Sequence, residues 1–304
     1  MSRMNSQAWQ FPPPLQAGDL LYVIAPSGAL KELERFKQGV EVWQSRGYQV
    51  VFAPHWNARY GYLAGTDDQR REALLHAWRD RNCQGILCAR GGYGGARLLE
   101  AWQWENTAAK WLIGFSDVTG LLWSLATQNV GSIHGPVLTT LANEPDWSKA
   151  RLFAAVEGQA LPPLQGIGWG GGTVTGRLLP ANLTVATHLL FTPVQPALNG
   201  VILALEDVTE APYRLDRMLT QWRMSGVMQQ VAGIALGRFS QCEGNPGTWT
   251  VAEMLRDRLA DLDIPIVSEL PFGHDGANAA LPVGQMATLD GDNGVLTLEG
   301  TRDQ

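Results

Sequence analysis

Short apolar runs alternate with amphipathic stretches along the first half of the chain. Residues 20–25 form an apolar run that Pro26-Ser27-Gly28 ends, which predicts a buried strand followed by a turn. In residues 31–46 apolar side chains recur every three or four positions, which predicts an amphipathic helix that ends at Gly47. The alternation continues with strands over 48–53, 85–89 and 111–114 and helices over 67–82, 96–102 and 120–128. This order is typical of the units that build a parallel sheet.

Residues 144–172 interrupt the alternation. They have weaker periodicity and contain three prolines and the cluster Gly168-Trp169-Gly170-Gly171-Gly172, so we expect a linker whose glycines form a hairpin turn or a mobile lid. The pattern beyond the linker predicts further strands and helices. The strands are expected over 173–179, 200–205, 231–236, 265–270, 285–289 and 294–298, and the helices over 183–190, 214–222 and 248–262.

The pattern as a whole predicts an α/β protein of two domains, which also suits a length of 304 residues. We expect a flexible, proline-rich lead over 1–18 that lacks the apolar centre of a signal peptide. A parallel-sheet domain of layered α/β structure follows over 19–143. The linker over 144–172 then leads into a smaller mixed α/β domain over 173–304.

Composition and charge exclude several classes of protein. Hydrophobic residues make up 45% of the chain and charged residues 17%, a balance that excludes global disorder. The 23 Lys and Arg against 29 Asp and Glu give a net charge of −6, which is unlike a nucleic-acid binder. No apolar run reaches the ~18 residues that a membrane span requires. We therefore expect a soluble, intracellular protein without a nucleic-acid or membrane partner.

The three cysteines, Cys83, Cys88 and Cys242, argue against a disulfide framework and fit a reducing compartment. Cys83 and Cys88 stand five positions apart, which is not the spacing of a CxxC redox or zinc pair. We therefore expect no metal ion at these cysteines, and nothing else in the sequence indicates a cofactor.

A glycine-rich loop, Arg90-Gly91-Gly92-Tyr93-Gly94-Gly95, follows the strand predicted over 85–89. The carboxyl ends of strands are where open α/β sheets place their sites. Consecutive glycines expose N–H groups and let a ligand approach the backbone. The loop has neither Walker nor GxGxxG spacing. A phosphate cradle, an oxyanion hole and a tight turn without a ligand all remain open.

Ser116 lies in Gly114-Phe115-Ser116-Asp117-Val118, at a predicted strand-to-helix junction. A serine on such a turn projects its hydroxyl group, and the N–H of the next residue faces any oxyanion that forms, as in a nucleophile elbow. Val118 occupies the position of the second glycine of GxSxG. The alternative is a helix N-cap, a common place for serine.

A carboxylate and an imidazole follow strands of the second half. Glu206 ends the apolar strand over 200–205, and His274 lies between glycines in a loop. A carboxylate can orient an imidazole, which can then act as the base for a serine nucleophile. For Glu206 the alternative is helix capping or an ion pair with Arg214 or Arg217. For His274 the rival bases are His55 and His134.

Seven short segments follow one another along the chain between residue 20 and about residue 285, and each is weak alone. The segments are Ala25-Pro26-Ser27-Gly28, Ala64-Gly65-Thr66-Asp67, Ala89-Arg90-Gly91-Gly92-Tyr93-Gly94, Gly114-Phe115-Ser116-Asp117-Val118-Thr119, His134-Gly135-Pro136, Leu205-Glu206-Asp207-Val208 and Phe272-Gly273-His274. In this order, and over nearly the whole chain, they resemble the L,D-carboxypeptidase family of serine peptidases, which also includes the microcin C immunity-type peptidases.

The resemblance implies an N-terminal domain like class I glutamine amidotransferases and a cleft with a catalytic triad. In that triad Ser116 is the nucleophile, His274 the general base and Glu206 the group that orients it. The implied oxyanion donors are the N–H groups of Gly91, Gly92 and Asp117.

Substrate contacts are expected from Arg90, Tyr93 and Asn182. Arg90 and Arg214 are the candidates for a terminal carboxylate, and for each the alternative is a structural ion pair. Asn182 stands in Pro180-Ala181-Asn182, where the family often has Gly-Gly-Asn. The loss of the two glycines bears on specificity more than on chemistry.

The activity implied by the resemblance is release of the C-terminal D-alanine of murein tetrapeptides, by a cytoplasmic homodimer that needs no metal. One alternative keeps the triad and cleaves peptidyl- or aminoacyl-nucleotide antibiotics, with Trp169 stacking on the base. Another is a non-catalytic protein that binds phosphate or another ligand. An amidotransferase-like enzyme would need cysteine at position 116, which is serine.

Overall fold

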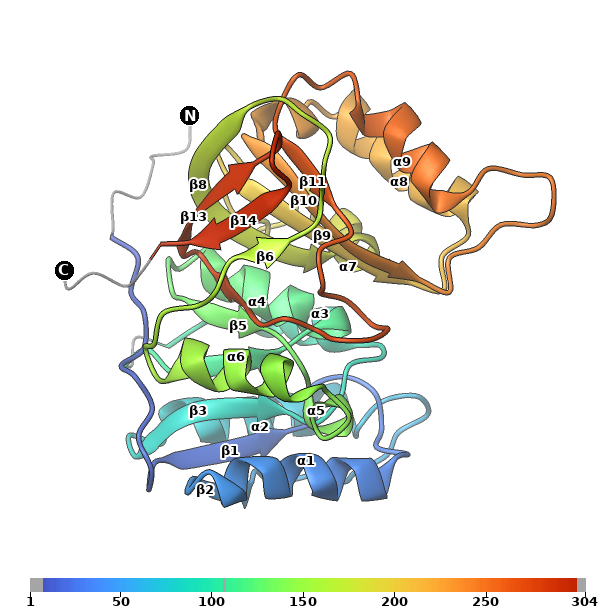
Figure 1. The fold of residues 1–304 in the computed structure, drawn as a ribbon. Helices are drawn as coiled ribbons and strands as arrows, with labels where there is room; N and C mark the ends of the chain where they lie inside the picture. Colours follow the sequence, from blue (N-terminus) through green and yellow to red (C-terminus); the bar gives the residue numbers. More distant parts are fainter. Residues whose placement is uncertain (1–7, 106–107, 300–304) are drawn as a thin grey trace.

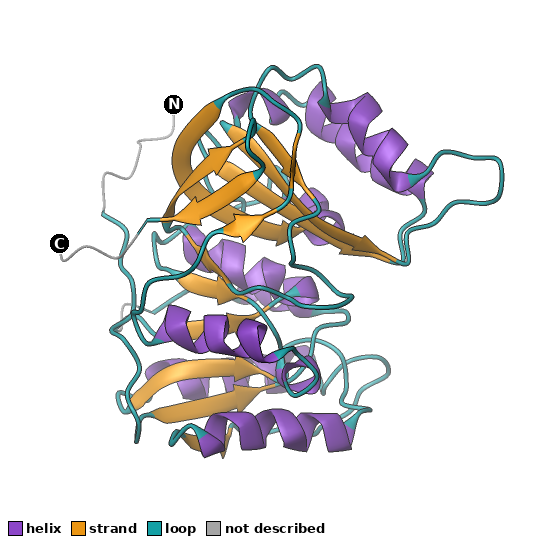
Figure 2. Cartoon of the chain, viewed as in Figure 1, coloured by secondary structure: helices purple, strands orange, loops and turns teal. Residues whose placement is uncertain are grey.

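The computed structural model describes residues 8–105 and 108–299 and contains two β-sheets, one above the other in Figure 1. Figure 2 shows that helices cover both faces of the lower sheet. The predicted α/β class is therefore confirmed. The likeness of the first layer to class I glutamine amidotransferases stays a prediction.

The first sheet has five parallel strands and one antiparallel strand at its edge. The strands are β1 (Leu20–Ile24), β2 (Gln49–Phe52), β3 (Cys83–Cys88), β4 (Trp111–Gly114), β5 (Ser132–His134) and β12 (Leu281–Val283). Their order is β12-β5-β4-β3-β1-β2, with β12 antiparallel to β5. A parallel sheet is buried on both faces, which explains the continuous apolar runs in these strands.

Helices on each face of the first sheet build its two hydrophobic cores. Side chains of α1 (Leu33–Ser45), α5 (Leu138–Leu141) and α6 (Asp146–Val156) share one core. Side chains of α2 (Asp67–Arg79) and α4 (Thr119–Ala126) share the other. Thr66 begins α2 with a capping box, since its hydroxyl accepts the Gln69 N–H and the Gln69 side chain accepts the Thr66 N–H.

The second sheet is mixed and closes on itself. Its order is β6 (Leu164–Gln165), β14 (Val295–Leu298), β13 (Met286–Asp290), β8 (Thr173–Asn182), β9 (Ile202–Val208), β10 (Gly233–Ser240), β11 (Ile266–Ser268) and β7 (Ile167–Gly168). The strands at its two edges are separated in sequence only by Gly166, whose N–H donates to the Gly294 carbonyl at 2.8 Å. A Cβ at Gly166 would lie 2.2 Å from the Ser268 carbonyl oxygen, so only glycine fits at this closure.

Helix α4 lies between the two sheets (Figure 1) and packs against a helix of the second domain. All eight residues of α4 are buried, because α7 (Leu183–Leu189) covers its outer side. The Trp123 indole donates to the Pro180 carbonyl at 3.2 Å and lies 6.4 Å from the ring of Trp222, on α8 (Pro212–Met224). A helix buried on every side has few ways to shift, so α4 fixes one sheet against the other.

Three segments differ from the sequence-based expectations. The expected linker over 144–172 contains α6, whose Leu152 and Phe153 are buried in the first domain's core. Strand β12 returns from the C-terminal part of the chain to the first sheet. Of the lead expected to be flexible, residues 8–18 are held through Pro12 and Leu15, which are buried, Leu15 with only 4% of its surface exposed; residues 1–7 lie outside the described part.

Replacing Trp123 with alanine should remove about 3–5 kcal/mol from the free energy of unfolding, because a fully buried indole leaves a cavity between the sheets. Trp249 is the matched control: it is 60% exposed, so its replacement should cost about 0.5 kcal/mol or less. Urea titration followed by circular dichroism measures both. Equal losses in the two variants would contradict this packing.

Candidate active site

Ser116 stands on a strained turn between β4 and the buried helix α4. Its φ is +62°, a left-handed conformation that is costly for a residue with a side chain. The turn continues as a 3₁₀-helix over Ser116–Val118 directly into α4. This is the geometry of a nucleophile elbow rather than of an N-cap, since Ser116 is itself the first residue of the 3₁₀-helix.

The three predicted triad residues meet. The Nε2 atom of His274 lies 3.0 Å from the Oγ of Ser116, and its Nδ1 lies 2.6 Å from Oε2 of Glu206. Glu206 is fully buried at the end of β9. A carboxylate can only accept, so Nδ1 carries the proton and Nε2 is left to accept the hydroxyl proton of Ser116. The arrangement can therefore generate a serine nucleophile.

The surroundings of His274 favour its protonated form. Burial is the largest influence and lowers the pKa of the imidazole, but the hydrogen bond with Glu206 and the charges of Glu206, Asp207 and Asp275 together outweigh it. The pKa of His274 is therefore raised above its ordinary value. Such a base is stabilised at the moment it takes the proton of Ser116.

The glycine loop after β3 lies against the nucleophile. A Cβ at Gly91 would be 2.9 Å from the Cβ of Ser116 and 3.1 Å from its Oγ, so glycine is required for this approach. The Gly28 N–H donates to the Gly91 carbonyl at 3.1 Å. In a trans peptide the carbonyl and the next N–H point in opposite directions, so the N–H of Gly92 points away from Gly28. Among the described residues the N–H groups of Gly91 and Gly92 have no acceptor, so they are available to an oxyanion.

Asp117 ties the nucleophile turn to this loop. Its Oδ2 accepts the Gly95 N–H at 2.7 Å at the start of α3 (Gly95–Leu98). A Cβ on Gly95 would lie 2.8 Å from the same oxygen. The side chain of Asp117 is therefore structural, while its backbone N–H directly follows the nucleophile.

Two predicted substrate residues border the loop. Arg90 is 22% exposed, donates to the Ala29 carbonyl at 2.9 Å and lies 3.5 Å from Glu32. Tyr93 is 58% exposed. By contrast Arg214 lies on the surface and faces Glu210, four residues before it, at 3.4 Å, which is an ordinary surface ion pair.

The side chain of Asn182, which the sequence predicts to contact substrate, is buried and bonded within the protein instead. It is 4% exposed, and its Oδ1 caps α7 by accepting the Val185 N–H at 3.1 Å. Its Nδ2 lies 3.2 Å from both Glu206 and Asp207. Every polar atom of this side chain is therefore occupied behind the triad.

The rival histidines are not bases for Ser116. His55 pairs with Glu72 at 3.1 Å, outside the triad. His134 is fully buried beside Phe115, and burial lowers its pKa to about 4. Within the described ranges its ring nitrogens have no hydrogen-bond partner, so it stays neutral within the core.

Trp169 and its glycine cluster lie at the other end of the second sheet from the triad. The indole donates to the Ser268 hydroxyl at 2.9 Å, and the Arg256 guanidinium stacks on it at 4.3 Å. A Cβ at Gly171 would lie 2.5 Å from Ile264, just before β11. The cluster thus packs where the parallel strands begin, whereas Glu206 is near the end of β9. It neither covers the triad nor offers a stacking surface there.

Buried polar residues that sequence reasoning missed hold the His274 loop. Glu144 accepts the Asn278 N–H at 2.8 Å and the Ser148 hydroxyl at 2.7 Å. Asn278 in turn accepts the Gly273 N–H at 3.1 Å, next to His274. Burial raises the pKa of Glu144. No local sequence signal marks these residues, because the partners are more than 120 positions apart.

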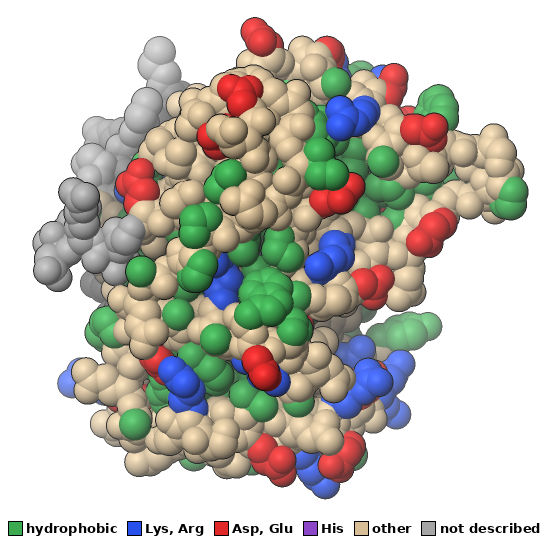
Figure 3. Space-filling view, viewed as in Figure 1, with side chains coloured by type: hydrophobic (Ala, Val, Ile, Leu, Met, Phe, Trp, Pro, Cys, Tyr) green, Lys and Arg blue, Asp and Glu red, His purple; other side chains and the backbone are tan. Residues whose placement is uncertain are grey.

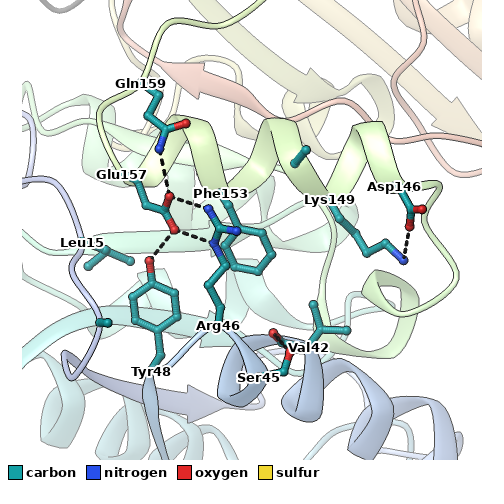
Figure 4. Close-up of a pocket in the computed structure, with 12 residues that line it drawn as sticks. Leu15, Val42, Ser45, Arg46, Tyr48, Asp146, Lys149, Phe153, Glu157 and Gln159 are labelled. Atoms are coloured by element: carbon teal, nitrogen blue, oxygen red, sulfur yellow. Dashed lines mark hydrogen bonds and ion pairs between the residues drawn. The ribbon is translucent and has the colours of Figure 1, made fainter.

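A surface groove of about 850 Å³ lies between α1 and α6 (Figure 4). Arg46 and Tyr48 both bind Glu157 there, with distances of 2.7 to 2.9 Å. None of the twelve lining residues belongs to the triad. This ion-pair cluster fastens α6 to the first domain.

Within residues 8–105 and 108–299, no group of three or more His, Cys, Asp or Glu is placed to hold a metal ion. In the same ranges no helix is both long and apolar enough to cross a membrane. On the face in Figure 3, Lys and Arg side chains are interspersed with Asp and Glu.

The chain is similar in sequence to two domain families and to named proteins of other organisms. Residues 21–135 match the LD-carboxypeptidase N-terminal domain, and residues 175–289 match the LD-carboxypeptidase C-terminal domain. A Synechocystis protein provisionally named a carboxypeptidase is 60% identical over 94% of this chain and 96% of its own length. The murein tetrapeptide carboxypeptidase of Pseudomonas aeruginosa is 33% identical over 95% of this chain and 97% of its own.

Solved structures agree with the fold. The muramoyltetrapeptide carboxypeptidase of Oxalobacter formigenes is similar with a TM-score of 0.83 and 28% identity, covering 92% of this chain and 97% of the other. The microcin C7 self immunity protein MccF, solved with aspartyl sulfamoyl adenosine, shares the fold with a TM-score of 0.87 at 20% identity. The match covers 97% of this chain and 99% of MccF. The chain therefore belongs to the LD-carboxypeptidase family.

Proposed function

We propose that this protein is a serine peptidase that hydrolyses the L,D-peptide bond and releases the C-terminal D-alanine of murein tetrapeptides. The hydrogen-bonded series Ser116, His274 and Glu206 carries the proposal, with distances of 3.0 and 2.6 Å. The substrate class comes from the names of the Pseudomonas aeruginosa and Oxalobacter formigenes relatives.

The proposed reaction has two steps with the same residues. Nε2 of His274 takes the Ser116 proton as Oγ attacks the carbonyl carbon, and the N–H groups of Gly92 and Asp117 stabilise the oxyanion. The imidazolium then protonates the leaving amine of D-alanine. Water attacks the acyl-enzyme with His274 again as base, which releases the shortened peptide and restores the Ser116 hydroxyl.

A carboxypeptidase must also hold the terminal carboxylate of its substrate. Arg90 is placed for this, since it starts the loop that touches Ser116 and keeps part of its side chain exposed. Tyr93 extends into solvent from the same loop. Cytoplasmic location and a homodimer belong to the same proposal and rest on the family resemblance.

The competing functions are less well supported. Cleavage of a nucleotide conjugate relied on Trp169 for base stacking, and Trp169 packs away from the triad. A non-catalytic ligand-binding role leaves the left-handed turn at Ser116 and the buried Glu206 without a purpose. Both remain outcomes of the experiment below.

Incubating the protein with a murein tetrapeptide should release one D-alanine, and Ser116→Ala should abolish this release because no nucleophile remains. Mass spectrometry of the peptide measures both. An aminoacyl-sulfamoyl adenosine assayed in parallel serves as the competing substrate. Cleavage of that compound alone would overturn the murein assignment, and equal cleavage by wild type and variant would overturn the serine mechanism.

The pH dependence of kcat/KM should follow His274. The base must be neutral to take a proton, so activity falls as pH drops through its pKa, which lies above the ordinary 6.5. In Glu206→Gln the negative charge is lost and only a neutral amide oxygen can accept from Nδ1, so the midpoint should move to lower pH. The plateau should fall by up to about 10⁴-fold, as when an orienting carboxylate is lost. An unchanged midpoint would contradict the Glu206 role.

Gly91→Ala should reduce kcat by about 100-fold without unfolding the protein, because the new methyl group would lie 2.9 Å from the Ser116 Cβ and displace the nucleophile. Gly120→Ala is the matched control, since its Cβ would meet its nearest neighbour at 3.5 Å, an ordinary contact. Steady-state kinetics and thermal melting separate the two effects. Full activity in Gly91→Ala would contradict the close approach.

A further inference from the structure

A second buried carboxylate, Asp207, lies behind the triad and is not used by the proposed reaction. It is 2% exposed and follows Glu206 in β9. Its Oδ2 accepts the N–H and the hydroxyl of Thr184, both at 2.8 Å. Its Oδ1 accepts the Val208 N–H at 2.8 Å and the Asn182 Nδ2 at 3.2 Å. All four partners donate, which is the environment of an ionised carboxylate.

Asn182 connects this carboxylate to the triad. Its amide nitrogen has two hydrogens and lies 3.2 Å from Oε1 of Glu206 and 3.2 Å from Oδ1 of Asp207. Its amide oxygen accepts the Val185 N–H at 3.1 Å. Because one end of the amide faces two carboxylates and the other faces an N–H, only one of its two orientations satisfies all three contacts.

We propose that Asp207 is a positioning residue: it holds the Asn182 amide toward Glu206, and Glu206 thereby stays aligned with His274. Both Glu206 oxygens are engaged in this arrangement, Oε1 by Asn182 and Oε2 by His274. Rotating the carboxylate breaks one of these bonds. The inference rests on the proposed function, since it concerns the same general base.

The charges around Asp207 give the inference a pH signature. The titratable groups whose charges interact with it are Glu206 on its own strand, His274 after β11 and Cys242 after β10. Asn182 on β8 and Thr184 on α7 are neutral. Burial is the main cause that raises the pKa of Asp207 to about 6, and burial raises that of Cys242 to about 12, so the thiol stays neutral.

Two protonations therefore lower activity on the acid side. Falling pH protonates His274, whose pKa is raised, and removes the free base. Falling pH also protonates Asp207 near its pKa of about 6, which disturbs the bond to Asn182. The wild-type plot of log kcat/KM against pH should then approach a slope of 2 on the acid side rather than 1.

The test is Asp207→Asn. The NH₂ group of the new asparagine is a donor and would face groups that also donate, so the Asn182 amide should turn. As a result kcat should fall about tenfold to a hundredfold with little change in KM. The acid slope should become 1. The midpoint should move to lower pH, because a charge that stabilises protonated His274 is removed. Asp257→Asn, an exposed residue of α9 (Val251–Leu259), makes the same charge change and should match wild type.

Two further variants distinguish the proposed role of Asp207 from a loss of activity caused by misfolding of Asp207→Asn. Thr184→Val removes one donor to Asp207 and should raise that residue's pKa, so the acid limb should move to higher pH, opposite to Asp207→Asn. In the Asn182→Ala background, Asp207→Asn should add almost nothing, because its effect passes through Asn182. Thermal melting checks that each variant is folded.

The readout is hydrolysis of the tetrapeptide together with the rate at which a fluorophosphonate labels Ser116. Labelling reports the nucleophile independently of the peptide, so absence of labelling in wild type would remove the proposed function and this inference with it. Normal labelling and hydrolysis with an Asp207→Asn profile parallel to wild type would overturn the inference alone. The inference would also be overturned if the effects of Asp207→Asn and Asn182→Ala on kcat were fully additive.

Discussion

The hydrogen bond between His274 and Ser116 joins the two sheets, and the candidate chemistry depends on it. Ser116 follows β4 of the first sheet, while Glu206 and His274 belong to β9 and the loop after β11 of the second. The 3.0 Å distance is therefore set by how the sheets pack. The buried helix α4 fixes that packing from one side. Strand β12 fixes it from the other, since it enters the first sheet seven residues after His274.

Buried charge is the second constraint. An isolated carboxylate in the core is costly, and it persists only where donors surround it. Glu206, Asp207 and Glu144 each have such donors, and together they hold the base and its loop. The charges of Glu206 and Asp207, together with that of Asp275, raise the pKa of His274 although it is largely buried. Polar bonds, not the apolar core alone, therefore give this site its geometry.

The sequence predicts most of the fold because the strands of the parallel core are apolar runs between amphipathic helices. It misses β5, β12 and α6, because short strands and a helix with weak periodicity give little local signal. The triad residues are recognisable at strand ends and within the family segments. The roles of Asn182 and Trp169 are not, since they depend on pairing with residues far away in sequence. Local pattern cannot specify which way such a side chain points.

Intact-mass spectrometry after reaction with a fluorophosphonate, with wild type beside His274→Ala, shows whether residues from the two sheets form one nucleophilic unit. If they do, wild type carries a single adduct on Ser116 and the variant is labelled much more slowly, because the hydroxyl loses its base. No adduct on Ser116, or labelling at the same rate in both proteins, would contradict such a unit.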